Sequence, residues 1–584
     1  MINLEEPYNK EIFNKFLRDY LPKDARFVEE KLNLDSSYKY FINVKIIARA
    51  NSLENLSVFE IEHNTSESKR ISIANDLFRL LKSLACKNAL IITHSKNIQN
   101  YRFSNYRFSL VTSSLEWKTD KTVKRVFSNP RRSSFLLGKG AKLHTPYRQL
   151  KKKITNFSDL KNCFDIEVVN KEFFENYKNL FLNIKEKFDN DKIFSSFLRN
   201  KKLDSDFFSK RLLGQIIFCY FLQKKKWLGV SRDKKFGSGD ENYLRNQFNL
   251  FNKNKKNFFN EFLEHFFYDG LNDKNKDHFV KKINSKVPYI GGTLFEYYEG
   301  YDWKKENLDI PNSYFSNSKK NGILDIFDLY NFTVDENEDY DVDIAVDPEM
   351  LGKVFENLIS VKDRKSKGTF YTPRNIVKFM CQEVLIEYLN KNYQQKNNDL
   401  NKIFFETLIK ENFLEFKNIK LNNDKLNEID KLLKNIRICD PAIGSGAFAV
   451  EILNQIVNLR KKIDNLLNRN ERSSYVLKNE CIQSCIYGVD IDKSAVEIAK
   501  LRLWLSLIVD VKDYDKAEPL PNLDYKIIKG NSLYSVEKNL LNQSSFEELE
   551  ELKKNYYNSS SFNEKMNIRS NIEKILNEMC GNEF

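Results

Sequence analysis

The stretch Arg437–Phe448 reads Arg-Ile-Cys-Asp-Pro-Ala-Ile-Gly-Ser-Gly-Ala-Phe, and it decides how the rest of the chain is interpreted. A short apolar run ends at Asp440, a glycine-rich turn follows, and an apolar segment continues to about Val457. This order predicts a strand, a tight loop and the start of a helix. Gly444 and Gly446 carry no Cβ, so the backbone can adopt positive φ angles and approach a ligand closely. Backbone N–H groups at a helix start favour a carboxylate or phosphate, so the pattern predicts a ligand-binding loop.

Two later segments have the same character of a strand that runs into a polar residue. The apolar run within Cys485–Asp492 ends at Asp490, and the run within Tyr525–Leu533 is followed by Asn531. In a parallel sheet the carboxyl ends of the strands meet at one edge, so Asp440, Asp490 and Asn531 are expected to face the same crevice. A carboxylate at the tip of the second strand is suited to hold the hydroxyls of a ribose.

Length and composition indicate a folded protein of several domains. The chain has 584 residues, 41% hydrophobic and 13% aromatic, which favours large cores over disorder. Its net charge is +14. A Lys-rich solvated surface and an affinity for nucleic acid both explain that charge, and charge alone leaves both open.

The sequence predicts a cytoplasmic protein. Its first residues lack the basic and apolar regions of a signal peptide, and the longest apolar run, Leu212–Leu222, is about half a membrane span and is expected to be a buried helix. The eight cysteines are scattered, as is typical of reduced thiols in a cytoplasm.

Residues 1–162 are expected to form a mixed α/β domain. Strands are predicted at 41–48, 58–61, 89–93 and 106–111, and a helix at 69–85. A core of this kind occurs in many folds, among them the PD-(D/E)xK nucleases.

Glu60 and Glu62 are the acidic pair in this region that could serve such a nuclease. Two side chains two residues apart on a strand share one face, so both carboxylates could reach one Mg²⁺ ion. Glu62 stands where these nucleases carry a Lys, and His63 with the basic pair Lys69-Arg70 could compensate. The alternative is an ordinary strand edge without a metal.

Residues 163–345 are expected to form a helical connector, because apolar residues recur at three- and four-residue spacing. The acid-rich segment Asp335–Asp343 is interpreted as a solvated linker. Residues 346–584 then form the third domain, so the predicted fold class is α/β: a nuclease-like domain, a helical connector and a partial Rossmann-like domain.

The chain resembles the adenine-specific DNA methyltransferases, and more narrowly the single-polypeptide type IIG-like restriction–modification enzymes. The segments that carry the resemblance are Phe370-Tyr371-Thr372-Pro373, Asp440-Pro441-Ala442-Ile443-Gly444-Ser445-Gly446-Ala447-Phe448, Gly488-Val489-Asp490-Ile491-Asp492 and Gly530-Asn531-Ser532-Leu533, with the connector sequences 288–295 and 347–356. It covers residues 160–584 well and the first 160 in outline. It implies S-adenosyl-L-methionine as cofactor and double-stranded DNA as partner.

The resemblance also implies a role for each matching residue. The cofactor-binding residues would be Thr372, Pro373, Asp440, Ala442, Gly444, Gly446, Phe448, Asp490, Ile491 and Asn531. Backbone around Ala442 and Gly446 would cradle the methionine moiety, with Asp440 near its ammonium group. Asp490 would hold the ribose, Ile491 would pack on the adenine, and Asn531 would hydrogen-bond the adenine edge.

The family's catalytic motif, Asn/Asp-Pro-Pro-aromatic, is missing from this sequence. The last prolines are Pro519 and Pro521, and a charged helical tail is expected over Phe546–Met579. One interpretation is the front part of a methyltransferase that needs a second polypeptide with the catalytic motif and a target-recognition domain. Another is a non-catalytic protein, or a remnant, that binds S-adenosylmethionine and DNA. A small-molecule methyltransferase is a third, which the basic balance and the long N-terminal region disfavour.

Overall fold

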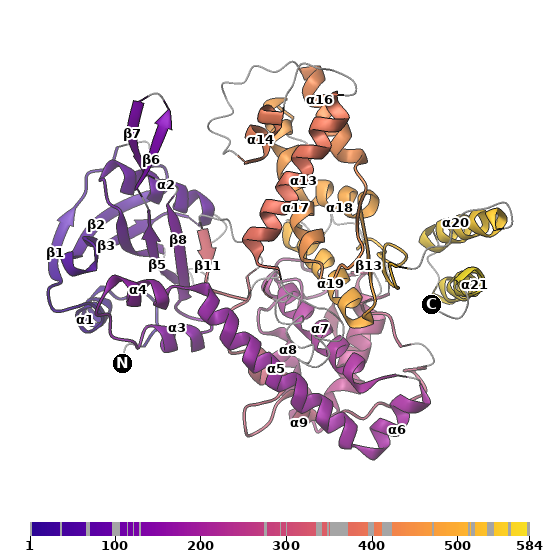
Figure 1. Ribbon diagram of the computed structural model, residues 1–584. Helices are drawn as coiled ribbons and strands as arrows, with labels where there is room; N and C mark the ends of the chain where they lie inside the picture. Colours follow the sequence, from indigo (N-terminus) through magenta and orange to yellow (C-terminus); the bar gives the residue numbers. More distant parts are fainter. Residues whose placement is uncertain are drawn as a thin grey trace. The chain divides into compact units, whose positions relative to one another are not determined.

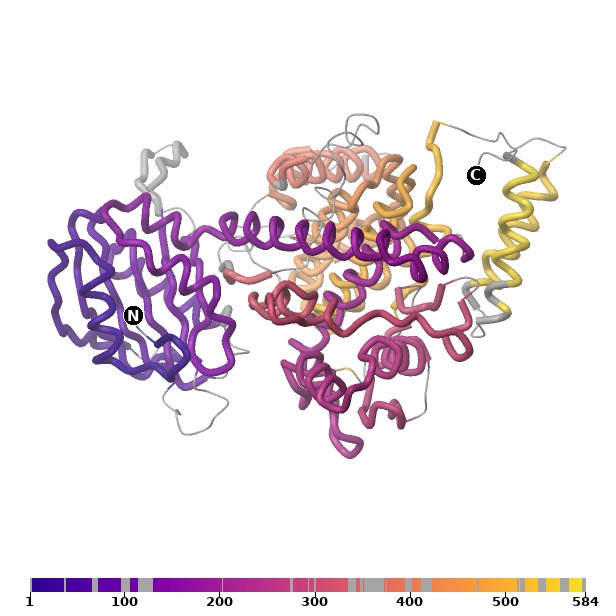
Figure 2. Tube along the Cα trace, turned by 90° about the horizontal axis from the view of Figure 1, so that it is seen from below, coloured from indigo at the N-terminus to yellow at the C-terminus, as the bar shows by residue number. Residues whose placement is uncertain are grey.

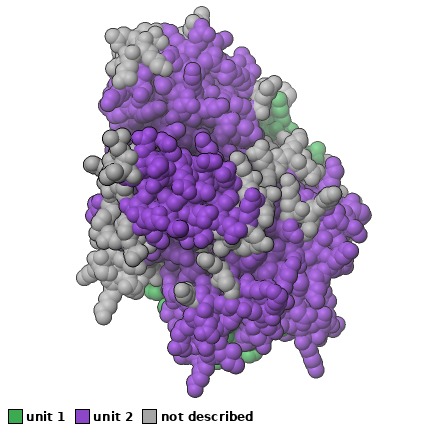
Figure 3. All heavy atoms as spheres, turned by 90° about the vertical axis from the view of Figure 1, so that its right-hand side faces the viewer, with its two compact units in different colours: residues 1–182, 312–350 green, residues 183–311, 351–584 purple. Residues whose placement is uncertain are grey.

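The computed structural model describes residues 3–35, 38–65, 70–95, 105–113, 115–120, 122–127, 130–201, 203–273, 277–291, 294–298, 301–333, 341–346, 350, 372–394, 402–410, 423–469, 472–511, 514, 520–533, 542–558 and 562–580. The chain divides into two compact units. Unit 1 comprises residues 1–182 and 312–350, and unit 2 comprises 183–311 and 351–584 (Figure 3). The domain limits expected at 162 and 345 remain a prediction.

Unit 1 contains a seven-stranded sheet in the order β1-β2-β3-β4-β5-β8-β11 (Figure 1). Its strands are β1 (Arg26–Lys31), β2 (Phe41–Ala50), β3 (Leu56–His63), β4 (Asn88–Ser95), β5 (Tyr106–Thr112), β8 (Arg131–Leu137) and β11 (Asp341–Asp343), and β6 (Leu115–Asp120) pairs separately with β7 (Thr122–Phe127). The unit's helices are α1 (Lys10–Tyr20), η1 (Asn51–Leu53), α2 (Arg70–Ser83), α3 (His144–Gln149), α4 (Phe157–Cys163), α9 (Asn312–Phe315), α10 (Ile323–Phe327) and the first part of α5 (Ile166–Asn190).

The strands and the helix predicted in the first 162 residues are confirmed. β3 and β4 pair in parallel, which requires a crossover, and α2 supplies it. Apolar side chains of β2, β3 and β4, among them Val44, Ile61 and Ile91, are buried against Leu77 of α2. This core holds β3, the strand that carries Glu60 and Glu62.

The interpretation of Asp335–Asp343 as a linker is wrong at its carboxyl end. Asp341–Asp343 is strand β11, which pairs in parallel with β8 at the edge of the sheet. The acidic side chain is accommodated there because Arg107 of β5 donates to Asp343, with Nη1 and Oδ1 2.8 Å apart. Residues 334–340 lie outside the described residues.

Unit 2 begins with the helical part that the sequence predicts (purple to magenta in Figure 2). It contains the end of α5, α6 (Lys192–Asn200), α7 (Ser205–Lys224), α8 (Tyr243–Lys253), the π-helical turns η3 (Phe259–Leu263) and η4 (His265–Leu271), and β9 (Phe279–Val280), η5 (Lys281–Ile283) and β10 (Ser285–Lys286). The run Leu212–Leu222 is buried throughout, as expected for a helix that is apolar on all sides. No helix among the described residues is long and apolar enough to cross a membrane.

The second part of unit 2 contains a three-stranded parallel sheet with the order β12-β13-β14. Its elements are α13 (Arg374–Gln394), α14 (Lys402–Lys410), α16 (Asn423–Asn435), β12 (Ile438–Asp440), α17 (Ala447–Leu466), α18 (Ser474–Ser484), β13 (Ile486–Asp490), α19 (Lys493–Asp510) and β14 (Ile527–Lys529). The strand, loop and helix predicted from residue 437 onward are confirmed, and α17 extends beyond the expected end at Val457.

The predicted C-terminal helices are α20 (Gln543–Asn558) and α21 (Phe562–Cys580), and a buried carboxylate holds them to the parallel sheet. Asp524, just before β14, accepts hydrogen bonds from Lys500 of α19 (2.9 Å), Tyr556 of α20 (2.6 Å) and Arg569 of α21 (2.9 Å). Burial by itself raises the pKa of Asp524, but the charges of Lys500 and Arg569 outweigh it and lower the pKa to about 2. Leu549 and Ile572 complete the contact with an apolar cluster.

We predict that Asp524→Asn loosens α20 and α21, because Lys500 and Arg569 would lose their shared anion inside the protein. Breaking a buried ion pair from one side costs about 3 to 5 kcal/mol. Trypsin should therefore cut faster at Lys553 and Lys554, and Glu548→Gln, which neutralises an exposed carboxylate of α20 that is not paired with either lysine, should not change the rate. Since the folded-state pKa lies below the usual value, the wild-type stabilisation should persist above about pH 4 and fade as pH drops toward 2. Equal cleavage rates in both variants would contradict this role.

Candidate cofactor-binding site

The loop between β12 and α17 turns sharply through two glycines. Gly444 has φ = 52° and Gly446 has φ = 81°, both in the left-handed region that favours glycine. A Cβ on Gly446 would lie 3.2 Å from the Cβ of Ala499, so α17 and α19 approach each other closely at this point. Gly446 is also the N-cap of α17, and no side chain caps the helix there. The start of α17 therefore presents backbone rather than side chains to a ligand.

The loop is held against β13 by a second close approach. The backbone N–H of Ile443 donates to the carbonyl of Val489 (2.9 Å), and the Ile443 side chain lies over Gly488. A Cβ added to Gly488 would be 2.3 Å from Cδ1 of Ile443, which is closer than real atoms can come. Gly488 is thus required by packing, although the sequence presents it only as part of a motif.

Asp490, at the tip of β13, organises the loop by hydrogen bonding. One carboxylate oxygen accepts from the N–H of Gly444 (2.8 Å), and the other accepts from the N–H of Asp492 (2.9 Å). The carbonyl of Asp490 also accepts from the N–H of Gly530 (2.9 Å), which begins the third loop. Each carboxylate oxygen has a second lone pair, so Asp490 retains capacity to accept from a ligand hydroxyl.

Asp440 ends β12 next to these groups and is half-buried. Its Oδ1 accepts from the N–H of Ala442 (3.0 Å). Burial raises the pKa of Asp440, and the negative charge of Asp490 adds to the effect. Two carboxylates therefore stand at neighbouring strand tips, where a cationic group would be favoured.

The two residues expected to contact an adenine are exposed. Ile491 is 59% exposed, and Asn531 is exposed with its Oδ1 accepting from the N–H of Leu533 (3.1 Å). Ser532 hydroxyl donates to the carbonyl of Pro441, which joins the third loop to the first. The structure therefore brings Asp440, Asp490 and Asn531 to one edge of the sheet, as predicted.

Thr372 and Pro373 immediately precede α13, and Phe370 and Tyr371 lie outside the described residues. α13 packs along α17, and its Cys381 Sγ is 3.9 Å from the carbonyl oxygen of Phe448. This contact places the first half of α13 near the loop. Burial raises the pKa of the Cys381 thiol, and the charges of Glu451 and Asp440 add to the effect.

A buried arginine that the sequence analysis did not identify holds the loop by hydrogen bonds. Arg502 of α19 donates through Nη1 to the carbonyl (2.9 Å) and the hydroxyl (3.1 Å) of Ser445. Arg502 is buried in α19 among mostly apolar side chains, and a cation between the leucines of such a helix is the signal that could have identified it.

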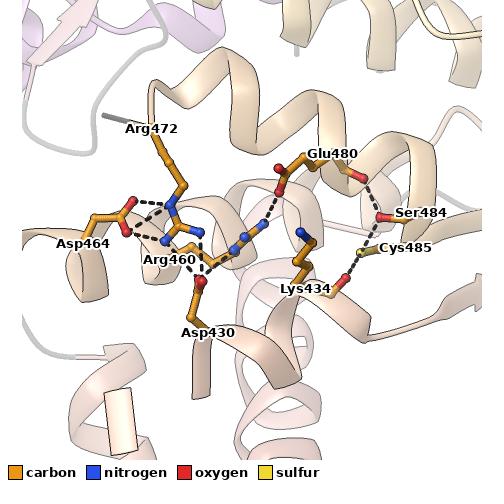
Figure 4. A network of polar contacts seen from close by, with 8 residues as sticks. All are labelled: Asp430, Lys434, Arg460, Asp464, Arg472, Glu480, Ser484 and Cys485. Carbon is orange, nitrogen blue, oxygen red and sulfur yellow. Dashed lines mark hydrogen bonds and ion pairs between the residues drawn. The ribbon is translucent and has the colours of Figure 1, made fainter. Parts of the chain in front are cut away.

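Buried charges also fix the helices around the strands (Figure 4). Asp430 of α16 accepts from Arg460 of α17 (2.9 Å) and from Arg472 (2.8 Å), and Arg472 also pairs with Asp464. Burial works to raise the pKa of Asp430, but the hydrogen bonds from Arg472 and Arg460 hold it below its usual value. At the other end of the network, Cys485 donates to the carbonyl of Lys434 (3.4 Å), which joins α16 to the start of β13.

The acidic pair of unit 1 lies on β3, where Glu60 is buried and Glu62 is half-buried. Tyr8 donates to Glu60 (2.7 Å), and the His94 ring stacks on Tyr8 with Nε2 3.9 Å from Glu60. Burial lowers the pKa of His63 to about 4, so this imidazole is neutral at pH 7. Within the described ranges no group of three or more potential metal ligands is present, so the Mg²⁺ site at Glu60 and Glu62 remains a prediction.

Residues 416–555 match the DNA-methyltransferase domain family of MmeI. The chain is 31% identical over 361 residues to a predicted type II restriction enzyme and methyltransferase of Methanocaldococcus jannaschii, covering 58% of this chain and 28% of that protein. It is 22% identical over 300 residues to DNA methyltransferase A of Bacillus subtilis, covering 50% of this chain and 27% of the relative. The chain thus spans about a quarter of the length of these relatives.

Similarity to solved structures is weaker. The structure of the type IIL restriction-modification enzyme MmeI in complex with DNA is 17% identical, with a TM-score of 0.38 over 62% of this chain and 40% of that chain. Residues 416–555 are therefore similar to the DNA-methyltransferase domain of restriction–modification enzymes.

We predict that Gly488→Ala destabilises this domain by about 1 to 3 kcal/mol, because the added methyl group would overlap the Ile443 side chain. Thermal unfolding of the domain measures the loss. Ile443→Val removes the overlapping Cδ1 atom, so combining it with Gly488→Ala should recover part of the stability. If the double variant loses as much stability as the sum of the losses in the two single variants, or more, the overlap is not the cause of the destabilisation.

Proposed function

We propose that residues 416–555 bind S-adenosyl-L-methionine and form the cofactor-binding part of a site-specific DNA adenine N6-methyltransferase of the restriction–modification type. The observation that carries this proposal is the pair of carboxylates, Asp440 and Asp490, at adjacent strand tips beside the glycine loop. The paired acids favour a ligand that carries cationic groups, and the α17 N-terminus favours one that also carries a carboxylate. A methionine moiety with an ammonium, a sulfonium and a carboxylate meets both requirements.

Each residue of the loop then has a distinct task. The backbone from Ala442 to Gly446 holds the methionine moiety, with Asp440 beside its ammonium group. Asp490 binds the ribose hydroxyls with its remaining lone pairs while it keeps Gly444 in place. Ile491, Asn531 and Phe448 surround the adenine, and Thr372 with Pro373 closes the opposite side. The bound cofactor supplies an activated methyl group for the exocyclic amine of the target base.

The amine must be held by hydrogen-bond acceptors and by an aromatic ring that stacks on the flipped base. The family's Asn/Asp-Pro-Pro-aromatic motif is missing from this sequence. We therefore propose that methyl transfer requires, in addition to this cofactor site, a segment that carries this motif and a target-recognition domain. Double-stranded DNA is the proposed partner, and the net charge of +14 supports it. A non-catalytic protein that binds the cofactor and DNA is the alternative, and methyl transfer by the chain alone would exclude it.

We predict that Gly444→Ala and Asp490→Ala each lower the affinity for S-adenosylmethionine about tenfold or more, equivalent to about 1.4 kcal/mol. Alanine resists the positive φ of Gly444, and loss of the Asp490 carboxylate removes both the ribose acceptor and the partner of the Gly444 N–H. Titration calorimetry measures the affinity, and Glu548→Ala on the exposed face of α20 is the control. Unchanged heats in both site variants would contradict the site assignment.

A metal-dependent nuclease activity of unit 1 is a second prediction, supported by a buried Glu60 on a central strand of the sheet. If it exists, the double variant Glu60→Ala, Glu62→Ala should abolish Mg²⁺-dependent DNA cleavage once the catalytic and recognition parts are supplied. Glu30→Ala, which removes a carboxylate from the exposed strand β1, should cut normally. Cleavage by the double variant would show that Glu60 and Glu62 are not required for a nuclease activity.

A further inference from the structure

A hairpin and a neighbouring loop in the helical part of unit 2 concentrate positive charge. The hairpin consists of β9 and β10 with η5 as its turn, and the loop comprises residues 230–239. Residues 230–239 and 278–287 together contain a single acid, Asp233. They contain six basic side chains, which we call the basic patch: Arg232, Lys234, Lys235, Lys281, Lys282 and Lys286.

Hydrogen bonds and ring contacts hold the loop against the hairpin. The N–H of Lys286 donates to the carbonyl of Val230 (3.1 Å), and its Nζ donates to the carbonyl of Lys234 (3.0 Å). The guanidinium of Arg232 lies 4.9 Å from the centre of the Phe279 ring, and Phe279 pairs with Lys286 across the hairpin. The loop and the hairpin therefore present their cations on one surface.

Most of this charge is not neutralised within the described part of the chain. Arg232 pairs with Asp277 (2.9 Å), and Lys286 has a backbone carbonyl as its acceptor. The other four lysines are exposed, and among the described residues no carboxylate forms an ion pair with any of them: Lys234, Lys235, Lys281 and Lys282. Four ammonium groups on one surface repel one another unless an anion binds there.

The lysines that precede this loop are used differently. Lys224 and Lys226 both pair with Glu241, at 2.9 and 3.1 Å. Lys225 donates to two backbone carbonyls at the end of α19, at 2.6 and 2.8 Å. These lysines stabilise the fold, so the unpaired cations of the basic patch are a local feature and not only a result of the Lys-rich composition.

Aromatic rings next to the basic patch keep it ordered. The ring of Phe236 lies 4.2 Å from that of Tyr514 and 5.8 Å from that of His278, centre to centre. The ammonium group of Lys286 lies 4.9 Å from the centre of the Phe236 ring, and a cation is attracted to the face of such a ring. A charged surface that is already ordered loses less conformational entropy when it binds a partner.

The basic patch is remote from the candidate cofactor site. Its neighbours Tyr514 and Lys225 lie at the C-terminal end of α19, whereas Asp490 and Asp492 adjoin the N-terminal end. A helix rises about 1.5 Å per residue, so the 18 residues of α19 span about 27 Å. A ligand on the basic patch is therefore not the cofactor, nor the base that would receive its methyl group.

We propose that the basic patch binds the phosphate backbone of double-stranded DNA without reading the base sequence. This inference rests on the proposed function, from which it takes DNA as the partner, and it adds a contact surface separate from the cofactor site. Lysine is a compact charge on a flexible stem, which suits phosphate oxygens without imposing a fixed geometry. DNA presents a regular row of phosphates that several lysines can contact at once.

The burial of the aromatic rings favours a duplex over a single strand. Proteins that bind single strands expose aromatic rings on which the bases stack. Here Phe236, His278, Phe279 and Tyr514 are all half-buried, and cations of the basic patch lie over two of them. The exposed groups are ammonium ions, which are suited to phosphates and not to stacking.

Binding of a short fluorescein-labelled DNA duplex of arbitrary sequence to the full-length chain tests this proposal. Fluorescence anisotropy measures the affinity at several NaCl concentrations. The double variants Lys234→Ala, Lys235→Ala and Lys281→Ala, Lys282→Ala each remove two unpaired cations. We expect each to lower the affinity about tenfold and to reduce the slope of log affinity against log salt by about 1.8, because each lost phosphate contact changes that slope by about 0.9.

A matched control separates the basic patch from the net charge of the chain. Lys431→Ala, Lys434→Ala removes two exposed lysines from α16 and changes the net charge by the same amount. Its slope should stay unchanged and its affinity should fall less than about twofold, because charges more than about 8 Å from the DNA are screened at physiological salt. Circular dichroism checks that the variants remain folded, as expected for exposed side chains.

Lysine acetylation gives a second measurement on the unaltered chain. An N-hydroxysuccinimide ester acetylates exposed lysines, and mass spectrometry locates the modified residues. The duplex should slow acetylation of the four unpaired lysines of the basic patch at least threefold. Acetylation of Lys431 and Lys434 should proceed at the same rate with and without DNA.

Several results would overturn the proposal. They are the absence of duplex binding by the unaltered chain, an equal loss of affinity in the patch and control variants, and unchanged acetylation of the patch lysines. Stronger competition by single-stranded DNA than by duplex at equal phosphate concentration, or stronger binding to phosphatidylserine vesicles than to duplex, would assign the basic patch to another partner.

Titration of S-adenosylmethionine into the same proteins keeps the two proposals apart. The patch variants should bind the cofactor as the unaltered chain does. If the unaltered chain fails to bind it, the proposed cofactor site is wrong, and protection of the patch lysines by duplex still decides the present inference. If cofactor binding is intact and duplex binding does not depend on the basic patch, only the present inference is wrong.

Discussion

The carboxylate of Asp490 holds together the parts of the candidate cofactor site. It receives the N–H of Gly444 from the loop after β12 and the N–H of Asp492 from the loop after β13. A single side chain thus fixes two loops that are separated in sequence by α17 and α18. Without it the positive φ angle of Gly444 would have no hydrogen bond to stabilise it, and the start of α17 would lose its orientation toward the strand tips. Charged acceptors form stronger hydrogen bonds than neutral ones, which suits a loop that must be preformed.

Close backbone approaches allow this hydrogen bond to form. Gly488 lets the Ile443 side chain lie directly over β13, and Gly446 lets α17 approach Ala499. From the other side Arg502 holds Ser445, and around the strands Arg460 and Arg472 share Asp430. Removing either partner of such buried pairs leaves an uncompensated charge, so the helices are fixed relative to one another as well as packed. Rigid support of this kind lets a loop of small residues hold a ligand through its backbone.

Local patterns predicted the strand tips well, because each of Asp440, Asp490 and Asn531 follows its own short apolar run. The strands of unit 1 could be predicted for the same reason. Contacts between distant segments were not predictable: Arg502 with Ser445, and Asp524 with Tyr556 and Arg569, depend on the tertiary fold. The prediction for β11 was wrong because a run of acidic residues usually indicates a solvent-exposed segment. In the fold, the ion pair with Arg107 compensates the charge of Asp343 at the edge of the sheet. Sequence pattern therefore reveals which residues end a strand, and packing decides which charges are satisfied.

The position of β12 in the parallel sheet explains why the candidate ligand groups gather at its tip. In a doubly wound sheet the first strand is central, and ligands bind where the chain direction reverses on either side of it. Here β12 has a neighbour on one side among the described residues, and the groups assembled at its tip, Asp440, Asp490 and the glycine loop, are those suited to hold a cofactor. The candidate site therefore lies at the carboxyl ends of the strands because the backbone N–H groups of the following helix become available there.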